Sequence, residues 1–188
     1  VATRVVEQHG GVVESFQGDA VVAVWGADPA TPGTPAAGAS GVDSRLEGAS
    51  ALPAGASHAG QALQAAIDLQ AAMHGVLPAP APEGLEPLAL GIGVETGPAM
   101  EGSFGLASRR THMVMGRTVT IASRLVGMTA DLSHPILVGE GLAAQVGGLG
   151  LQSMGTFLLD GLRVPHHVYA PPLSPAAAPV HEEEAARA

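Results

Sequence analysis

Residues 11–26 have the sequence GVVESFQGDAVVAVWG. Two runs rich in β-branched residues, VVESF and AVVAVW, flank a Gln-Gly-Asp linker. A short linker with glycine between two such runs is typical of a β-hairpin. The stretch therefore predicts a hairpin over residues 11–26 with Asp19 at its tip.

Helices and strands are interleaved along the rest of the chain. Apolar residues at helical spacing predict helices over residues 61–76, 118–129 and 140–146, and residues 1–9 resemble the end of an amphipathic helix. Runs typical of strands cover residues 88–96, 112–115, 135–138, 151–159 and 166–170. Thr118 is predicted to cap the second helix. This order predicts an α+β sandwich, with a sheet that carries helices on one face.

Three segments are poor in large apolar side chains or rich in proline. They are predicted to be a flexible insertion over residues 27–57, a Pro-rich connection over residues 77–87 and a disordered acidic tail over residues 171–188. We therefore expect one domain over residues 1–170. Because the first residue is Val1 and a helix end follows it, we expect the chain to be a piece of a longer protein.

The composition excludes several classes of function. The chain has 188 residues, 8 basic against 17 acidic, with a formal charge of −9, which disfavours nucleic acid as a partner. All basic residues are arginines, so a P-loop lysine and Schiff-base chemistry are excluded. No cysteine is present, which excludes disulfides and thiolate chemistry. No apolar run approaches the roughly 20 residues that span a bilayer.

Asp19 is the first candidate for chemistry. A carboxylate on a rigid tip after Gly18 can bind Mg²⁺, which needs one or two such ligands besides substrate phosphates. The alternative, favoured by the residues alone, is that Asp19 only satisfies backbone amides of its turn.

Arg124 is the second candidate. Thr120 and Arg124 are four residues apart on a predicted helix whose other residues are largely apolar, so they share one face. An arginine in this setting is suited to bind phosphate or a developing negative charge. A surface arginine paired with an acidic residue is the alternative.

Eight histidines raise the question of a metal site. His166 and His167 are adjacent on a predicted strand, so their side chains point to opposite faces and cannot bind one metal together. The other histidines are scattered. We interpret them as ordinary histidines rather than metal ligands.

Five blocks in order resemble the catalytic domain of the class III nucleotidyl (adenylate/guanylate) cyclases. They are GGVVESFQGDAVVAVWG, GIGVETGPAMEGSFG, RRTHMVMGRTVTIASRL, PILVGEGLA and MGTFLLDGLRVPHHVYA, and they span most of residues 5–170. The resemblance implies a ferredoxin-like βαβ sandwich that works as a homodimer, with the active site across the interface. It also implies two Mg²⁺ or Mn²⁺ ions held by two aspartates, which activate the ribose 3′-hydroxyl for attack on the α-phosphate.

The resemblance assigns roles residue by residue. Asp19 matches the second metal-binding aspartate, and Arg124 matches the arginine that stabilises the transition state. The nucleotide-binding positions that it implies are Ser15, Phe16, Gly18, Met113 and Thr120.

Several positions depart from the family pattern. The first metal-binding aspartate belongs to a strand upstream of this chain, so the isolated chain is expected to be inactive. Ser15 stands where a base-reading lysine or glutamate is usual, and Met113 where its partner aspartate or threonine is usual. Thr120 replaces the ribose-orienting asparagine. Asp160 replaces a triphosphate-binding lysine, and Arg117 or Arg163 is a candidate to replace the lost positive charge.

Two functions of different classes follow from this pattern. The first is an active cyclase that converts ATP, or alternatively GTP, to the cyclic monophosphate, with ATP favoured; retention of Asp19 and Arg124 favours this function. The second is a silent cyclase-homology domain that dimerises and relays a signal; the losses at Ser15, Thr120 and Asp160 favour it. Because nucleoside triphosphates are intracellular, we expect the domain to face the cytoplasm, below an upstream sensor or membrane tether in the full-length protein.

Overall fold

The computed structural model of the chain describes residues 1–26, 57–74, 76, 89–106, 109–147 and 149–172. The predicted insertion over residues 27–57 therefore lies, except for its last residue, outside the described residues. The predicted Pro-rich connection over residues 77–87 lies wholly outside them, as does the predicted tail from residue 173 onward. None of the helices in the described part is long and apolar enough to cross a membrane.

The predicted N-terminal hairpin is confirmed. Helix α1 (Ala2–Gln8) leads into strands β1 (Val12–Gln17) and β2 (Ala20–Val24), which pair antiparallel. Gly18 in the turn has a φ of +66°, a conformation that glycine adopts without steric cost. The Nε1 atom of Trp25 donates a hydrogen bond of 3.0 Å to the backbone oxygen of His9, which joins the hairpin to the end of α1.

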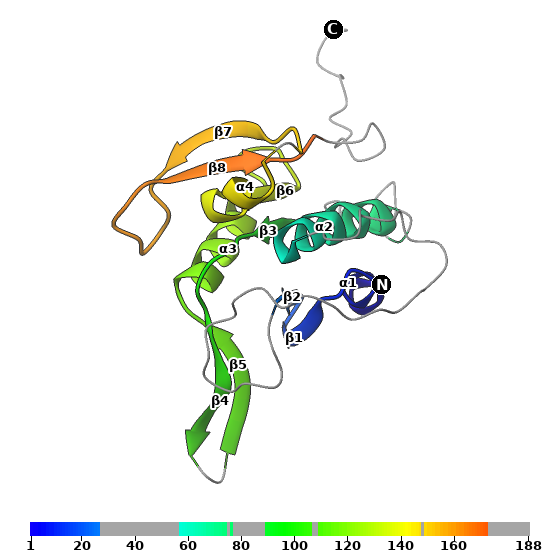
Figure 1. The fold of residues 1–188 in the computed structure, drawn as a ribbon, viewed down its shortest axis with the longest axis vertical. Helices are drawn as coiled ribbons and strands as arrows, with labels where there is room; N and C mark the ends of the chain where they lie inside the picture. Colours follow the sequence, from blue (N-terminus) through cyan, green and yellow to red (C-terminus); the bar gives the residue numbers. More distant parts are fainter. Residues whose placement is uncertain (27–56, 75, 77–88, 107–108, 148, 173–188) are drawn as a thin grey trace, which may run out of the picture.

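A four-stranded mixed sheet forms the centre of the fold (Figure 1). Its strands lie in the order β3 (Ile92–Val94), β6 (Ile136–Gly139), β8 (His166–Ala170) and β7 (Gln152–Phe157). The pair β3–β6 is parallel, whereas β6–β8 and β7–β8 are antiparallel. The closing pair of strands predicted from the sequence is therefore present, and β3 is shorter than the predicted strand over residues 88–96.

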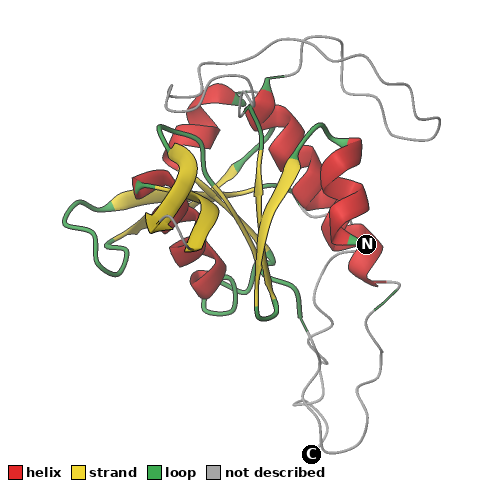
Figure 2. Cartoon of the chain, turned by 90° about the horizontal axis from the view of Figure 1, so that it is seen from below, coloured by secondary structure: helices red, strands yellow, loops and turns green. Residues whose placement is uncertain are grey.

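Two apolar cores lie on opposite faces of this sheet. Side chains alternate along β6, so Ile136 and Val138 pack with α2 (His58–His74) and α4 (Glu140–Gln145). Leu137 points to the other face and packs with α3 (Arg117–Met128). The α+β fold with a mixed sheet is as predicted. The sequence placed the helices on one face, whereas the structure has α3 on the other, and Figure 2 shows helices on either side of the strands.

A second hairpin extends away from the four-stranded sheet (Figure 1). It consists of β4 (Met100–Leu106) and β5 (Arg109–Met115), paired antiparallel as a sheet of their own. The sequence predicted the end of β5 but not β4, whose MEGSFGL sequence contains two glycines and no β-branched residue.

The start of α3 differs from the prediction. Its N-cap residue is Gly116, and no side chain caps the helix. The predicted cap, Thr118, lies inside the helix and donates its hydroxyl hydrogen bond to the backbone oxygen of Pro98 at 2.7 Å. Thr118 therefore fastens α3 to the segment after β3 instead of closing the helix end.

Candidate functional site

The tip of the β1–β2 hairpin presents Asp19 to solvent. In the described part of the chain, no hydrogen bond or ion pair engages its carboxylate, so the turn-satisfying role considered for it is not observed. Apart from Gly18 itself and its two chain neighbours, no described residue has an atom within 4 Å of the position that a Cβ would occupy at Gly18. The tip is therefore open on its Gly18 side, and the Asp19 carboxylate is available to a cation or a ligand.

Ser15 and Phe16 lie on the strand that leads to this tip. Ser15 pairs with Val22 across the hairpin, and its hydroxyl oxygen accepts a long hydrogen bond of 3.4 Å from the Gln17 side chain. The side chain of Phe16 is 66% exposed. Neither side chain is held tightly, so both remain available to a ligand at the hairpin.

Helix α3 presents Thr120 and Arg124 on its exposed face. Ile121 and Leu125 occupy the buried face, so the prediction that Arg124 lies on a largely buried helix is wrong for this residue. The Nε atom of Arg124 donates a hydrogen bond of 3.0 Å to the backbone oxygen of Asp160. The Thr120 hydroxyl donates to the backbone oxygen of Gly116 at 3.2 Å, within its own helix.

Met113 is half-buried on β5, opposite Gly102 of β4. Among the described residues, no hydrogen bond or ion pair joins Asp19 to Thr120 or Arg124. The predicted residues therefore form two groups within one chain. Ser15, Phe16, Gly18 and Asp19 share the hairpin, and Thr120 and Arg124 share one face of α3.

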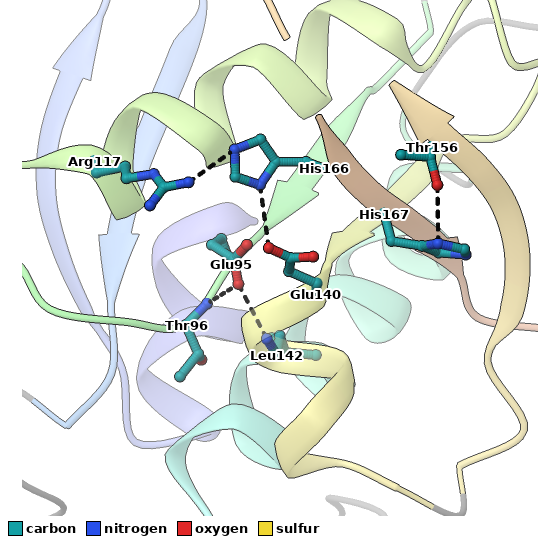
Figure 3. A network of polar contacts seen from close by, with 8 residues as sticks. All are labelled: Glu95, Thr96, Arg117, Glu140, Leu142, Thr156, His166 and His167. Atoms are coloured by element: carbon teal, nitrogen blue, oxygen red, sulfur yellow. Dashed lines mark hydrogen bonds and ion pairs between the residues drawn. The ribbon is translucent and has the colours of Figure 1, made fainter. Parts of the chain in front are cut away.

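Arg117 is engaged in a network around His166 (Figure 3). The Nη2 atom of Arg117 lies 3.2 Å from Nε2 of His166, whose side chain is almost fully buried. Because arginine only donates hydrogen bonds, Nε2 of His166 is the acceptor. Nδ1 in turn lies 3.4 Å from a carboxylate oxygen of Glu140. Arg117 uses only Nη2 in this network, so its role as the substitute for the missing lysine stays a prediction.

His167 points to the opposite face of β8, as predicted. One ring nitrogen lies 3.1 Å from the Thr156 hydroxyl (Figure 3), and the other lies 2.7 Å from the Ser153 hydroxyl; both partners are on β7. The two neighbouring histidines therefore contact different residues on opposite faces of β8.

Glu95 carries a partly buried carboxyl group that the sequence did not single out. Its carboxylate accepts hydrogen bonds from the backbone N–H groups of Thr96 at 2.7 Å and Leu142 at 3.0 Å, the latter at the start of α4 (Figure 3). Burial raises the pKa of this carboxyl above its ordinary value, against the effect of the two hydrogen bonds. Gly139 and Gly141 surround the carboxylate, and a Cβ at either position would overlap it. These glycines were the only sequence signal for the site.

A family model describes more than half of this chain. Residues 39–139 match the adenylate and guanylate cyclase catalytic domain. The chain belongs to this family. The resemblance seen in the five sequence blocks is therefore confirmed.

A curated relative agrees with the family. The cyclase domain is 30% identical over 143 residues to "Adenylate cyclase 1" of Rhizobium meliloti (strain 1021). The match covers 76% of this chain and 18% of the relative, so the chain spans less than a fifth of that protein.

Solved structures share the fold of this cyclase domain. The adenylyl cyclase CyaB from P. aeruginosa has a TM-score of 0.64 at 21% identity, over 92% of this chain and 77% of that one. The guanylyl cyclase Cya2 has a TM-score of 0.61 at 22% identity, over 89% and 73%. A bacterial light-regulated adenylyl cyclase has a TM-score of 0.62 at 19% identity, over 96% and 43%. The predicted cyclase-homology fold is thereby confirmed.

Proposed function

We propose that this domain converts a nucleoside triphosphate to its 3′,5′-cyclic monophosphate and pyrophosphate, in cyclic-nucleotide signalling. The ribose 3′-hydroxyl loses its proton to water, its oxygen forms a bond to the α-phosphorus, the bond from that phosphorus to the bridging oxygen breaks, and pyrophosphate leaves. The observation that carries the proposal is an exposed, unengaged Asp19 on a glycine-built tip in a chain of the cyclase family. ATP is the preferred substrate in this proposal, because the curated relative is named an adenylate cyclase.

Asp19 fits the role of a ligand for a divalent cation. A carboxylate that is exposed and free of other partners in the described structure can accept a hard cation together with substrate phosphates. When bound, Mg²⁺ or Mn²⁺ would lower the pKa of the ribose hydroxyl and neutralise phosphate charge. Asp19 would position that charge at the hairpin tip, where the open side at Gly18 admits a phosphate group.

Arg124 fits the role of the transition-state arginine. Its hydrogen bond to the backbone of Asp160 uses only Nε, which leaves the N–H groups of both terminal nitrogens for phosphate oxygens. The same bond fixes the direction of the guanidinium before the nucleotide binds. A donor that is oriented in advance stabilises developing charge without reorganisation during the reaction.

A cleft between β2 and β3 suits the strand that the resemblance places before residue 1. In the described sheets, β2 pairs only with β1, and β3 only with β6, so each has an unpaired edge. A cavity of about 330 Å³ is lined by both strands and by residues of α1, α2 and α3. We propose that an extended strand with the first metal-binding aspartate enters here, because it would find hydrogen-bonding edges on both sides.

The active site in this proposal forms between two copies of the chain. Asp19 and Arg124 belong to separate groups within one chain, so the hairpin of one copy would meet α3 of its partner. The domain would work in the cytoplasm, where nucleoside triphosphates are found.

The test combines two inactive variants of the full-length protein. Asp19→Ala and Arg124→Ala are each expected to abolish turnover. In a symmetric dimer, mixing them in equal amounts makes half of the dimers mixed, and each mixed dimer has one intact site. The mixture is therefore expected to recover about one quarter of wild-type activity. A mixture as inactive as its components would contradict a shared site.

A further inference from the structure

Three potential metal ligands converge from three strands, away from Asp19 and Arg124. They are Glu14 of β1, Glu101 of β4 and His112 of β5. Glu101 and His112 also line the cavity proposed above for the upstream strand. The Nε2 atom of His112 lies 3.1 Å from a carboxylate oxygen of Glu101 and 3.9 Å from one of Glu14. One ligand atom from each residue lies within 4.8 Å of the others.

The backbone explains why these side chains meet. The β1–β2 register shifts between Val13 and Ser15, so Glu14 is the extra residue of a β-bulge. A bulge redirects a side chain away from the regular alternation of the strand. Glu101 pairs with Val114 while His112 pairs with Ser103, so Glu101 and His112 are diagonal neighbours on one face of the β4–β5 hairpin.

Glu14 supplies the independent sign that a ligand belongs here. Its side chain is only 6% exposed, and its Oε1 atom has no hydrogen-bond partner among the residues that the structure describes. A buried carboxylate oxygen without a partner carries an uncompensated desolvation cost. A protonated His112 between the two carboxylates would not satisfy this atom, because the ring lies next to the other oxygen of Glu14. A cation bound by both oxygens of the Glu14 carboxylate would lie against Oε1 as well.

We propose that Glu14, Glu101 and His112 bind a divalent transition-metal ion of the Zn²⁺ class. Two carboxylates and an imidazole suit such an ion better than Mg²⁺, which prefers oxygen ligands alone. Ligand atoms around a tetrahedral ion with bonds of about 2.0–2.1 Å lie roughly 3.3–3.4 Å apart. The 3.1 and 3.9 Å separations are close to this value, so small side-chain movements complete the site.

The ion would connect two hairpins that share no backbone ladder. The β1–β2 and β4–β5 pairs are separate two-stranded sheets. Three protein ligands leave a coordination position for water on the solvent side, where His112 is 53% exposed. The site is thus a clamp that fixes the orientation of the β4–β5 hairpin relative to the hairpin with Asp19.

The test titrates this chain with Zn²⁺ and, as a spectroscopic probe, Co²⁺. Binding is followed by calorimetry, by the visible absorption of Co²⁺ and by the thermal melt. Wild type is expected to bind one ion and to melt at a higher temperature with Zn²⁺. Glu14→Gln, Glu101→Gln and His112→Gln should each weaken binding by about tenfold or more, since even outer-shell changes cost 10–100-fold. Because His112 is exposed, its variant tests the site even if Glu14→Gln does not fold.

Two control variants separate this site from others. Glu7→Gln makes the same chemical change at an exposed position of α1 and should leave Zn²⁺ affinity unchanged. Asp19→Ala removes the proposed catalytic ligand and should also leave it unchanged, so the two proposals fail independently. Equal affinity in His112→Gln, Glu101→Gln and wild type would overturn the proposal. So would a folded wild type that does not bind Zn²⁺ or Co²⁺.

Discussion

The guanidinium of Arg124 is anchored to the backbone of Asp160, through a hydrogen bond of 3.0 Å from Nε to the carbonyl oxygen. The carboxylate of Asp160 takes no part in this bond. The residue therefore has two separable effects: its backbone orients the arginine, and its exposed side chain adds a negative charge beside it. A substitution at position 160 can therefore remove the negative charge and keep the backbone hydrogen bond to Arg124.

Asp160→Asn should improve nucleotide binding in the full-length protein. The substitution keeps the carbonyl that holds Arg124 and removes a charge that repels the triphosphate. KM for the nucleotide should fall by about two- to fivefold, the range expected of an exposed charge interaction. Steady-state kinetics measure the change, and the thermal melt should stay the same.

Asp131→Asn is the matched control for this prediction, since it removes an exposed negative charge beyond the end of α3. KM should not change in that variant. An equal fall in KM in both variants would mean that overall charge, rather than the position of Asp160, sets nucleotide affinity.

Glu95→Gln should alter how stability depends on pH. A glutamine oxygen can still accept the N–H bonds of Thr96 and Leu142, so the start of α4 keeps its partner. Burial raises the pKa of Glu95 above 4.5, so the folded state binds a proton more readily than the unfolded state. The wild-type carboxyl therefore makes its full contribution to the free energy of unfolding below pH 4.5. This contribution is lost as the pH rises through the pKa of the folded state.

The glutamine variant should consequently be more stable than wild type at neutral pH. This advantage should shrink as the pH falls toward 4.5, as measured by urea unfolding at a series of pH values. Glu7→Gln, at an exposed position of α1, is measured alongside as the control for the chemical change itself. An advantage of Glu95→Gln that grows in acid would show that the sign of the pKa shift is wrong.

Gly93→Ala should destabilise the fold through the contact between β3 and α3. A Cβ at Gly93 would lie 2.9 Å from both Leu125 Cβ and Val126 N, and would overlap the carbonyl oxygen of Ala122. Because most of these atoms belong to the helix backbone, they cannot move aside cheaply. Urea unfolding should show a loss of about 1–3 kcal/mol in the free energy of unfolding.

Gly127→Ala makes the same chemical change in α3 but should raise the free energy of unfolding. Nothing lies within 4 Å of its Cβ position, and the residue is within α3. Alanine has the higher helix propensity, so this variant should gain up to about 1 kcal/mol. Similar losses in both variants would indicate that α3 tolerates no substitution, rather than that β3 and α3 are closely packed at Gly93.

The elements set by local pattern could be predicted from the sequence. The N-terminal hairpin, helices α2, α3 and α4, and the closing strands β7 and β8 follow from apolar spacing and turn residues. Strand β4 could not be predicted, because its own residues are poor strand formers and its pairing with β5 determines its conformation. The placement of α3 on the second face also depends on tertiary packing, through the glycine at position 93.

Within the site, individual residues could be predicted but their convergence could not. Asp19 and Arg124 are indicated by short family motifs in the sequence, and their roles stay predictions. Glu14, Glu101 and His112 come from three strands, and a β-bulge that sequence patterns do not reveal directs Glu14 toward the other two. Glu95 was missed for a similar reason, since its partner Leu142 is 47 residues away in the chain.

Product analysis of the full-length protein shows directly whether the domain forms a cyclic nucleotide. The protein is incubated with Mn²⁺ and either ATP or GTP, and mass spectrometry measures cyclic AMP and cyclic GMP. We expect a cyclic product, with cyclic AMP in the larger amount. This product should disappear in Asp19→Ala and Arg124→Ala, while the thermal melts of both variants stay close to that of the wild type. If a folded dimer yields no cyclic product, the proposed cyclase activity is wrong. Ser15, Thr120 and Asp160 would then be signs of a silent domain.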